Sequence, residues 1–318
     1  MHEFLWFLQV NSLSALPERG HFMGAKKSDN NGFVPHHMNI TADDVKGNDG
    51  IGRYIILPGS DGRAAKISAH FKDVTVKKHP RCHNFYMGQV ETNGKMVDVA
   101  VVASGMGSPS IDIIVNELYR LGARRILRVG TAGSVQPSYI RVGALVIPTA
   151  SVRDETASAC YTPREVPAVA SLAFVESARR ACSVLGITNV FTGVVHSKDS
   201  LYAREFREGP MALEHEGYMK ILRDSGVLAS EMECSMLFTL GAVFNQQLKS
   251  AKLENTKGQP HGSYRFGPED QFLTGAVLAV IGDDSAFSDD ILVAETVDNA
   301  VKAGIETVKQ LAVSEMGL

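Results

Sequence analysis

Apolar and polar positions between residues 97 and 135 follow a pattern typical of a strand–helix–strand unit. A short apolar run, VAVV, ends at a turn rich in glycine, serine and proline, GMGSPS. Apolar residues then recur at steps of three and four, which predicts a helix with one buried face. That face consists of Ile111, Ile114, Val115, Leu118 and Leu121. A second apolar run, RILRV, leads into another glycine turn, GTAG, so the two strands are predicted to be parallel neighbours.

The ends of this helix, and one cation after it, suggest where a ligand would bind. Pro109 stands where a first helical turn tolerates proline, and Gly122 follows the last periodic residue. Ligands of such sheets bind beyond the carboxyl ends of the strands, where both glycine turns are predicted to lie. Arg128 interrupts the apolar run ILRVG, and a buried guanidinium needs a partner. Either a protein carboxylate or an anion beside the amides of residues 130–133 would meet that need.

An earlier segment, YIILPGSDGRAAKI, predicts a strand, a tight turn and a helix. Arg63 falls in the first turn of that helix, where a cation opposes the helix dipole. The position suits an arginine that shares an anion with the helix end, and it suits a solvated arginine equally well.

Later segments continue the alternation of strands and helices. Residues 168–186 are predicted to form a helix and residues 190–195 a strand, and the charged segment HSKDSLYAREFREG is predicted to be a loop of the kind that carries function. Residues 228–244 predict a mostly apolar helix, opened by Glu231 and Glu233, whose charges the helix dipole favours there.

The chain is predicted to end with one more strand and helix. The buried strand GAVLAVIG leads to Asp283 and Asp284. The apolar face of the last helix is predicted to consist of Val297, Val301, Ile305, Val308 and Ala312. The whole pattern is that of one α/β domain over residues 34–318, preceded by a flexible arm at 1–33 and carrying a surface insertion at 246–271.

Composition narrows the possible functions. The net charge of −3 gives no sign of a nucleic-acid surface, and no stretch approaches the length of a membrane helix. The four cysteines form no CxxC and no zinc spacing, which predicts reduced thiols and a cytoplasmic protein. Arginines and acids gathered at strand ends indicate an anionic ligand and a polyol.

Four motifs in order, PGSDGR, SGMGSPS, LRVGTAG and SEMEC, resemble those of the nucleoside phosphorylase family of the uridine/purine type. The segments HHMNIT and TASVR bring the chain nearest to the uridine-cleaving members. The resemblance implies a central mixed, partly barrel-like sheet flanked by helices. It also implies a pentosyltransferase that cleaves uridine, or related deoxyuridine and thymidine, with phosphate into uracil and ribose 1-phosphate for pyrimidine salvage.

The resemblance assigns residues to the phosphate and ribose sites. The third phosphate-binding cation would come from a neighbouring subunit, at His83 where the family has an arginine, with Arg81 two residues away. His37 would reach the 5′-hydroxyl in a neighbour's site. The phosphate residues implied are Gly59, Arg63, Arg128, Gly130, Thr131 and His83. The ribose residues implied are His37, Glu231, Met232 and Glu233.

For the base, the resemblance implies Glu205, Arg207, Thr131 and Gly133. The family has a glutamine where this chain has Glu205, and a carboxylate can accept a hydrogen bond from uracil N3–H but cannot donate one. Arg207 would then stabilise charge on the departing uracil, so that Arg63, Arg128 and Arg207 are the implied catalytic residues.

Three alternatives remain open on the sequence. Asp283 falls where purine-specific relatives carry a catalytic acid, although it is equally well explained as a solvated acid at a strand end. A nucleosidase of the same fold would use water instead of phosphate, and a non-catalytic protein would bind uridine without cleaving it.

The resemblance implies phosphate as co-substrate, no cofactor and a homo-oligomer, at least a dimer with shared sites. Some relatives hold an interface cation near positions matching Asn84, Met106 and Ser110, but these are poor direct ligands, so no metal is predicted.

Overall fold

The computed structural model describes residues 33–255, 266–284 and 290–318. Residues 35–318 form one compact unit. Nearly all of the predicted arm at 1–33, and residues 256–265 of the predicted insertion, lie outside the described residues.

Ten strands of this unit form a single mixed sheet in the order β10-β6-β8-β9-β5-β1-β4-β3-β2, with β7 beside β6. An additional pairing of β10 with β5 closes β5, β10, β6, β8 and β9 into a ring, which confirms the predicted barrel-like sheet. The strands are β1 (Tyr54–Leu57), β2 (Lys72–Lys77), β3 (Phe85–Thr92), β4 (Lys95–Val102), β5 (Arg125–Ser134), β6 (Leu145–Asp154), β7 (Ala168–Val169), β8 (Val190–Lys198), β9 (Ala229–Glu231) and β10 (Leu273–Gly282).

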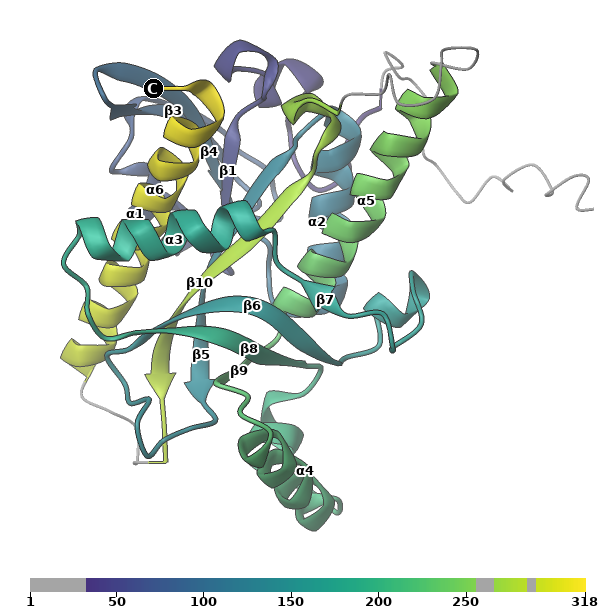
Figure 1. The fold of residues 1–318 in the computed structure, drawn as a ribbon, viewed down its shortest axis with the longest axis vertical. Coiled ribbons are helices and arrows are strands. Elements are labelled where there is room, and N and C mark those ends of the chain that lie inside the picture. The colour runs from purple at the N-terminus through teal and green to yellow at the C-terminus, as the bar shows by residue number, and fades with distance from the viewer. Residues whose placement is uncertain (1–32, 256–265, 285–289) are drawn as a thin grey trace, which may run out of the picture. The chain divides into compact units, whose positions relative to one another are not determined.

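Helices cover both sides of the sheet (Figure 1). Helices α2 and α5 pack side by side on one side, and α3 crosses α6 on the other. The helices are α1 (Asp61–Ser68), α2 (Ser108–Leu121), α3 (Leu172–Val184), α4 (Ala212–Asp224), α5 (Cys234–Asn255) and α6 (Asp290–Met316). Short helical turns are η1 (Ala42–Val45), η2 (Asn48–Gly50), η3 (Ser158–Cys160), η4 (Leu201–Glu205) and η5 (Pro268–Asp270).

Helix α2 confirms the pattern from which it was predicted. The five apolar residues of its predicted face are all buried, and each such side chain contributes roughly 1.5–3 kcal/mol through burial. Pro109 lies in its first turn, and Gly122 ends it in the left-handed conformation with φ 106°. A side chain at position 122 would be strained there, so the glycine stops the helix where β5 must begin.

The strands on either side of α2 are parallel but are not neighbours, which corrects the predicted pairing. Strand β1 lies between them and pairs in parallel with both β4 and β5. Periodicity within one segment cannot reveal an insertion by a strand that comes earlier in the chain. Because β1, β4 and β5 run the same way, the turns after all three meet at one edge of the sheet.

The predicted apolar helix at 228–244 is also wrong in its start and its end. Residues 229–231 form β9, and α5 begins at Cys234 and runs to Asn255, so residues 246–255 of the predicted insertion are helical. The helix predicted at 168–186 begins only at Leu172, because Ala168 and Val169 form β7. The predicted face of the last helix is confirmed for Val301, Ile305, Val308 and Ala312, which are buried, whereas Val297 is only half-buried.

Candidate functional site

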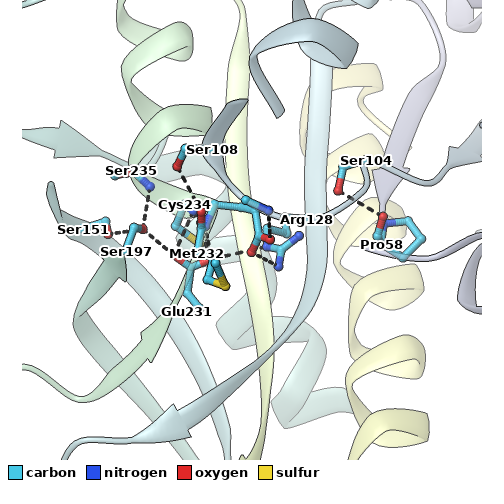
Figure 2. Close-up of polar contacts among 12 residues, drawn as sticks. Pro58, Ser104, Ser108, Arg128, Ser151, Ser197, Glu231, Met232, Cys234 and Ser235 are labelled. Atoms are coloured by element: carbon cyan, nitrogen blue, oxygen red, sulfur yellow. Dashed lines mark hydrogen bonds and ion pairs between the residues drawn. The ribbon is translucent and has the colours of Figure 1, made fainter. Parts of the chain in front are cut away.

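Two of the strand-end turns are hydrogen-bonded to each other. The backbone N–H of Ser104, after β4, donates to the carbonyl of Pro58, after β1, at 2.8 Å. The Ser104 hydroxyl reaches the same carbonyl at 3.3 Å, as Figure 2 shows. A Cβ on Gly59 would lie 3.6 Å from the carbonyl oxygen of Gly105. The turn that carries Arg63 is therefore held against the glycine turn that leads into α2.

Strand β5 carries two buried arginines with different surroundings. Arg125 is fully buried, and all of its nitrogens donate hydrogen bonds, to Glu315 and to backbone carbonyls. Arg128 is 4% exposed, yet its Nε and Nη1 have no hydrogen-bond partner among the described residues. Unsatisfied donors of this kind are costly, so the Arg128 guanidinium is arranged for a further acceptor.

The carboxylates of Glu231, which ends β9, and of Glu233 both lie beside Arg128. The Nη2 atom of Arg128 donates to Glu233 Oε2, and Nε lies 3.5 Å from Glu231 Oε2. A Cβ on Gly130 would lie 2.9 Å from Nε, so only glycine leaves room for the guanidinium to fold back over its own strand. A protein carboxylate, one of the two partners open from the sequence, is thus present. It does not exhaust the donors of Arg128.

Arg63 approaches the same place from α1. Burial, followed by the charge of Arg128, lowers the pKa of the Arg63 guanidinium, and the charge of Glu233 acts in the opposite direction. The two cations are therefore close enough to repel each other. The guanidinium of Arg63 forms no hydrogen bond or ion pair with any residue that the structure describes. Two convergent cations, one of them without a protein partner, fit an anion between them.

Glu231 and Glu233 were predicted to open a helix, but in the structure both precede α5, which begins at Cys234. Glu231 is buried and accepts hydrogen bonds from the backbone N–H groups of Glu233 and Cys234 and from the Ser197 hydroxyl. Figure 2 shows this chain of contacts, which continues from Ser197 to Ser151 and Ser235. Glu231 therefore caps α5 and is fully engaged by the protein.

Glu233 links the cations to the glycine turn that leads into α2. Its Oε1 accepts from the backbone N–H of Gly107 at 2.7 Å. Burial raises the pKa of Glu233 against the opposing charge of Arg128, and the nearby Glu231 carboxylate raises it further. One guanidinium serving two buried carboxylates accounts for that direction. Met232 lies between them, half-buried, with its carbonyl accepting from the Ser108 hydroxyl at 3.0 Å.

A cavity of about 240 Å³ opens where β5 and β10 end, at Ser134 and Gly282. Its lining includes Ser134, Glu205, Arg207 and Asp283. Glu205 lies so close to Gly133 that a Cβ on that glycine would overlap its carboxylate. Arg207 has φ 58° and forms a half-exposed ion pair with Glu216 at 3.4 Å. Of the residues implied for a base site, Glu205, Gly133 and Arg207 thus lie in one region.

Asp283 and Asp284 occupy different environments. The Asp283 side chain is 4% exposed, and its Oδ2 accepts from the backbone N–H of Val142 at 3.2 Å and lies 3.9 Å from Arg141. Asp284 is 60% exposed and forms an ion pair with Arg141 at 2.6 Å. The solvated-acid explanation therefore holds for Asp284 and is wrong for Asp283.

The two histidines implied at a neighbouring subunit's site are both anchored by the protein. His37 Nδ1 lies 2.8 Å from the buried carboxylate of Glu117 on α2. His83 Nδ1 lies 2.8 Å from the carbonyl of Ala103, so its ring stands beside the glycine turn that follows β4. Both rings have fixed positions on the molecule's own fold.

Sequence reasoning missed a buried polar chain behind the cavity. His196, fully buried on β8, lies 2.9 Å from Asp154 Oδ2 through Nε2 and 2.9 Å from the Ser230 hydroxyl through Nδ1. Arg204 pairs with Asp154 at 2.7 Å, and the Lys198 ammonium donates to Ser230 at 2.9 Å. These residues come from three strands and one turn, so no local pattern in the sequence indicates that they meet.

Asp154→Asn is expected to remove part of the acid sensitivity of folding. Burial alone raises the pKa of Asp154, but the hydrogen bond and charge of His196, with those of Arg204, outweigh it and lower the pKa below 3.8. A lowered carboxyl pKa contributes stability above the unfolded value and loses it as pH falls through the folded value. The difference in free energy of unfolding between wild type and the Asp154→Asn variant should stay constant down to about pH 5 and shrink below about pH 4. Urea unfolding at several pH values measures it, and a constant advantage to about pH 3 would contradict the assignment.

Among the residues that the structure describes, no three histidine, cysteine or acidic side chains are grouped to hold a metal ion. None of the described helices is both long enough and apolar enough to span a bilayer.

Comparisons with known proteins agree on one family. The family model described as "Phosphorylase superfamily" matches residues 53–249. A uridine phosphorylase of Treponema pallidum is 33% identical over 281 residues, covering 87% of this chain and 93% of the relative. A uridine phosphorylase of Escherichia coli is 35% identical over 211 residues, or 65% of this chain and 79% of that protein. A crystal structure of a uridine phosphorylase from Vibrio fischeri superposes with a TM-score of 0.66 at 22% identity over 89% of this chain and 96% of that one, which supports the fold.

Proposed function

This chain belongs to the phosphorylase superfamily, and from that membership we propose that it cleaves uridine with inorganic phosphate into uracil and ribose 1-phosphate. The two relatives compared above, of which 93% and 79% are covered, are named uridine phosphorylases. The protein is therefore a pentosyltransferase.

One observation carries the proposal. Arg128 keeps free hydrogen-bond donors in a buried position, beside the unpartnered guanidinium of Arg63 and the carboxylate of Glu233. An anion and a polyol that bind next to each other need this combination, because two cations hold the anion and a carboxylate accepts from the hydroxyls. Phosphate and ribose are such a pair.

The phosphate would lie between the two arginines. Each charge-assisted hydrogen bond from Arg63 or Arg128 to it contributes about 1.5–3 kcal/mol. Gly59 would supply the turn beside it, and Gly130 and Thr131 the backbone of β5. His83 of a neighbouring subunit would be the third contact to the phosphate, with its ring held by the hydrogen bond of Nδ1 to the Ala103 carbonyl.

The ribose would lie over Met232, with its 2′- and 3′-hydroxyls donating to Glu233. Glu231 holds Glu233 in place through the backbone contact at 2.9 Å. His37 of a neighbouring subunit, oriented by Glu117, would reach the 5′-hydroxyl.

Cleavage needs no covalent nucleophile from the protein. The glycosidic bond breaks toward an oxocarbenium-like sugar, and the phosphate held beneath C1′ stabilises that positive charge before bonding to it. Arg207 stabilises the negative charge on the departing uracil. Its present ion pair with Glu216 is half-exposed, and such pairs are worth little, so exchanging that partner for the base is inexpensive.

The purine alternative, with Asp283 as general acid, is disfavoured by the surroundings of that residue. Asp283 Oδ2 accepts from the backbone N–H of Val142 and lies 3.9 Å from Arg141, so this oxygen already has protein partners.

The assembly and location follow from the same proposal. We propose a homodimer, because His37 and His83 complete a neighbour's site, and a cytoplasmic protein, because its chemistry uses free phosphate and nucleosides.

A panel of uridine, thymidine, inosine and adenosine, each assayed with and without phosphate, tests the function. Uridine is expected to be consumed only with phosphate, as read by ultraviolet absorbance at high pH. Cleavage of uridine in water alone would indicate a nucleosidase, and preferential cleavage of inosine would support the purine alternative. Binding of uridine without release of uracil would indicate a non-catalytic protein.

A further inference from the structure

The end of β8 buries an ammonium group next to the cavity. Lys198 is 2% exposed and forms an ion pair with Glu205 Oε2, which is itself buried and has no hydrogen bond of ordinary geometry among the described residues. The remaining contacts of Lys198 Nζ are the Ser230 hydroxyl at 2.9 Å and the Glu231 carbonyl at 3.5 Å. Burying an ammonium group without a counter-charge costs free energy, and the carboxylate of Glu205 supplies the counter-charge for Lys198.

The turn that carries Glu205 is attached to the sheet at two adjacent residues. Arg204 pairs with Asp154 on β6, and Glu205 pairs with Lys198 on β8. The two attachments are joined behind the turn, because His196 contacts both Asp154 and Ser230 and Ser230 accepts from Lys198. Fixed at both points, η4 has little freedom to move its carboxylate.

This attachment holds Glu205 against Gly133 at the end of β5. Any side chain at position 133 would overlap the carboxylate, so glycine at this position makes room for it. Glu205 is thereby placed at the wall of the cavity, beside the end of β5.

We propose that Lys198 is the positioning residue for Glu205 and that this ion pair makes a ring N–H on the pyrimidine an obligatory feature of the substrate. The inference rests on the proposed function, and it adds the residue that sets base selectivity. A carboxylate held by an ammonium only accepts hydrogen bonds, whereas an amide in the same place both donates and accepts. The pair therefore favours uracil N3–H and penalises a base in which that hydrogen is replaced.

The pair also predicts a specific pattern of non-additivity. Removing Lys198 alone leaves a partly buried carboxylate without its counter-charge, and neutralising Glu205 alone leaves a buried ammonium without one. Changing both residues together removes both charges. The double variant should then be better than either single variant, which independent residues would not produce.

The experiment compares K198S, E205Q and K198S/E205Q with wild type. Each single variant is expected to raise KM for uridine by about 10- to 100-fold with KM for phosphate nearly unchanged. The double variant is expected to return to within about fivefold of wild-type kcat/KM, and its selectivity for uridine over 3-methyluridine should fall by at least about fivefold. A purely structural role would raise both KM values or lower kcat, and would leave the selectivity unchanged.

K72M is the matched control, because it breaks the exposed Lys72–Glu91 ion pair on β2 and β3, and its kinetics should match wild type. Thermal unfolding identifies any variant that fails to fold. If a single variant fails, the kcat/KM of the double variant and its selectivity for uridine over 3-methyluridine still test the proposal. Additive effects with normal wild-type activity would overturn this inference alone. Absence of uridine cleavage by wild type would overturn the proposed function and, with it, the inference.

Discussion

Arg128→Met is expected to reduce kcat/KM for uridine phosphorolysis by about a thousandfold or more. The guanidinium is buried, holds Glu233 and keeps Nη1 free for the anion, so the variant loses a phosphate donor and the group that orients the ribose-binding carboxylate. Positioned charges in a buried site act most strongly on the charge that develops in the transition state. Steady-state kinetics with uridine and phosphate measure the loss.

The same variant should also be less stable. Breaking a buried ion pair from one side costs about 3–5 kcal/mol, and here two carboxylates lose their shared cation. The pKa of Glu233, already raised, would rise further, and a raised carboxyl pKa means stability that is present at low pH and lost as pH rises through it. The deficit should therefore be larger at about pH 8 than at about pH 5.

R125K provides the matched comparison on the same strand. It disturbs the buried contacts of Arg125 with Glu315 and should lower stability while the folded protein keeps wild-type kinetics within a few-fold. Equal losses of activity in R128M and R125K would mean that Arg128 acts through folding alone.

Arg63→Met is expected to reduce kcat/KM by about a hundredfold, mainly through KM for phosphate, without loss of stability. Arg63 has no hydrogen bond or ion pair among the described residues, and its charge is repelled by Arg128. Removing it therefore breaks no hydrogen bond or ion pair with the described residues, and it relieves a like-charge interaction. Urea unfolding of R63M should give a free energy equal to or slightly above that of wild type.

Lys66→Met, on the same short helix and exposed, is the control for R63M and should leave both measurements unchanged. If R63M is well folded and its KM for phosphate is unaltered, Arg63 does not take part in binding the anion.

Local features of the chain could be predicted from the sequence because local physics determines them. The burial of Ile111, Leu118 and their companions follows from helical spacing, and Gly122 ends α2 because it can adopt the left-handed conformation. The glycine turns predicted after β1 and β4 lie at the carboxyl ends of those strands, whereas residues 130–133, also predicted as a turn, continue β5 to Ser134.

Long-range arrangement could not be predicted in the same way. The insertion of β1 between β4 and β5 depends on pairing with a distant segment. Glu231 and Glu233 match the acids of a first helical turn, but β9 pairs with β5 and β8 and so delays the start of α5 to Cys234.

In the candidate site too, local features could be predicted from the sequence and long-range contacts could not. Arg125 and Arg128 are both arginines in an apolar strand, and only their partners, supplied by α6 and by the segment after β9, distinguish a satisfied cation from an open one. Lys198 and His196 lay within a segment predicted to carry function, but their partners come from other strands. Four motifs in order indicated the family, whereas this buried chain has no motif.

The uridine assay in the presence of phosphate, followed by phosphorus NMR, tests most directly whether phosphate is the group that accepts the sugar. If Arg63 and Arg128 hold one phosphate beneath the sugar, wild-type protein given uridine and phosphate will convert inorganic phosphate into a sugar phosphate in step with uracil release. Release of uracil with the inorganic phosphate signal unchanged would contradict the account.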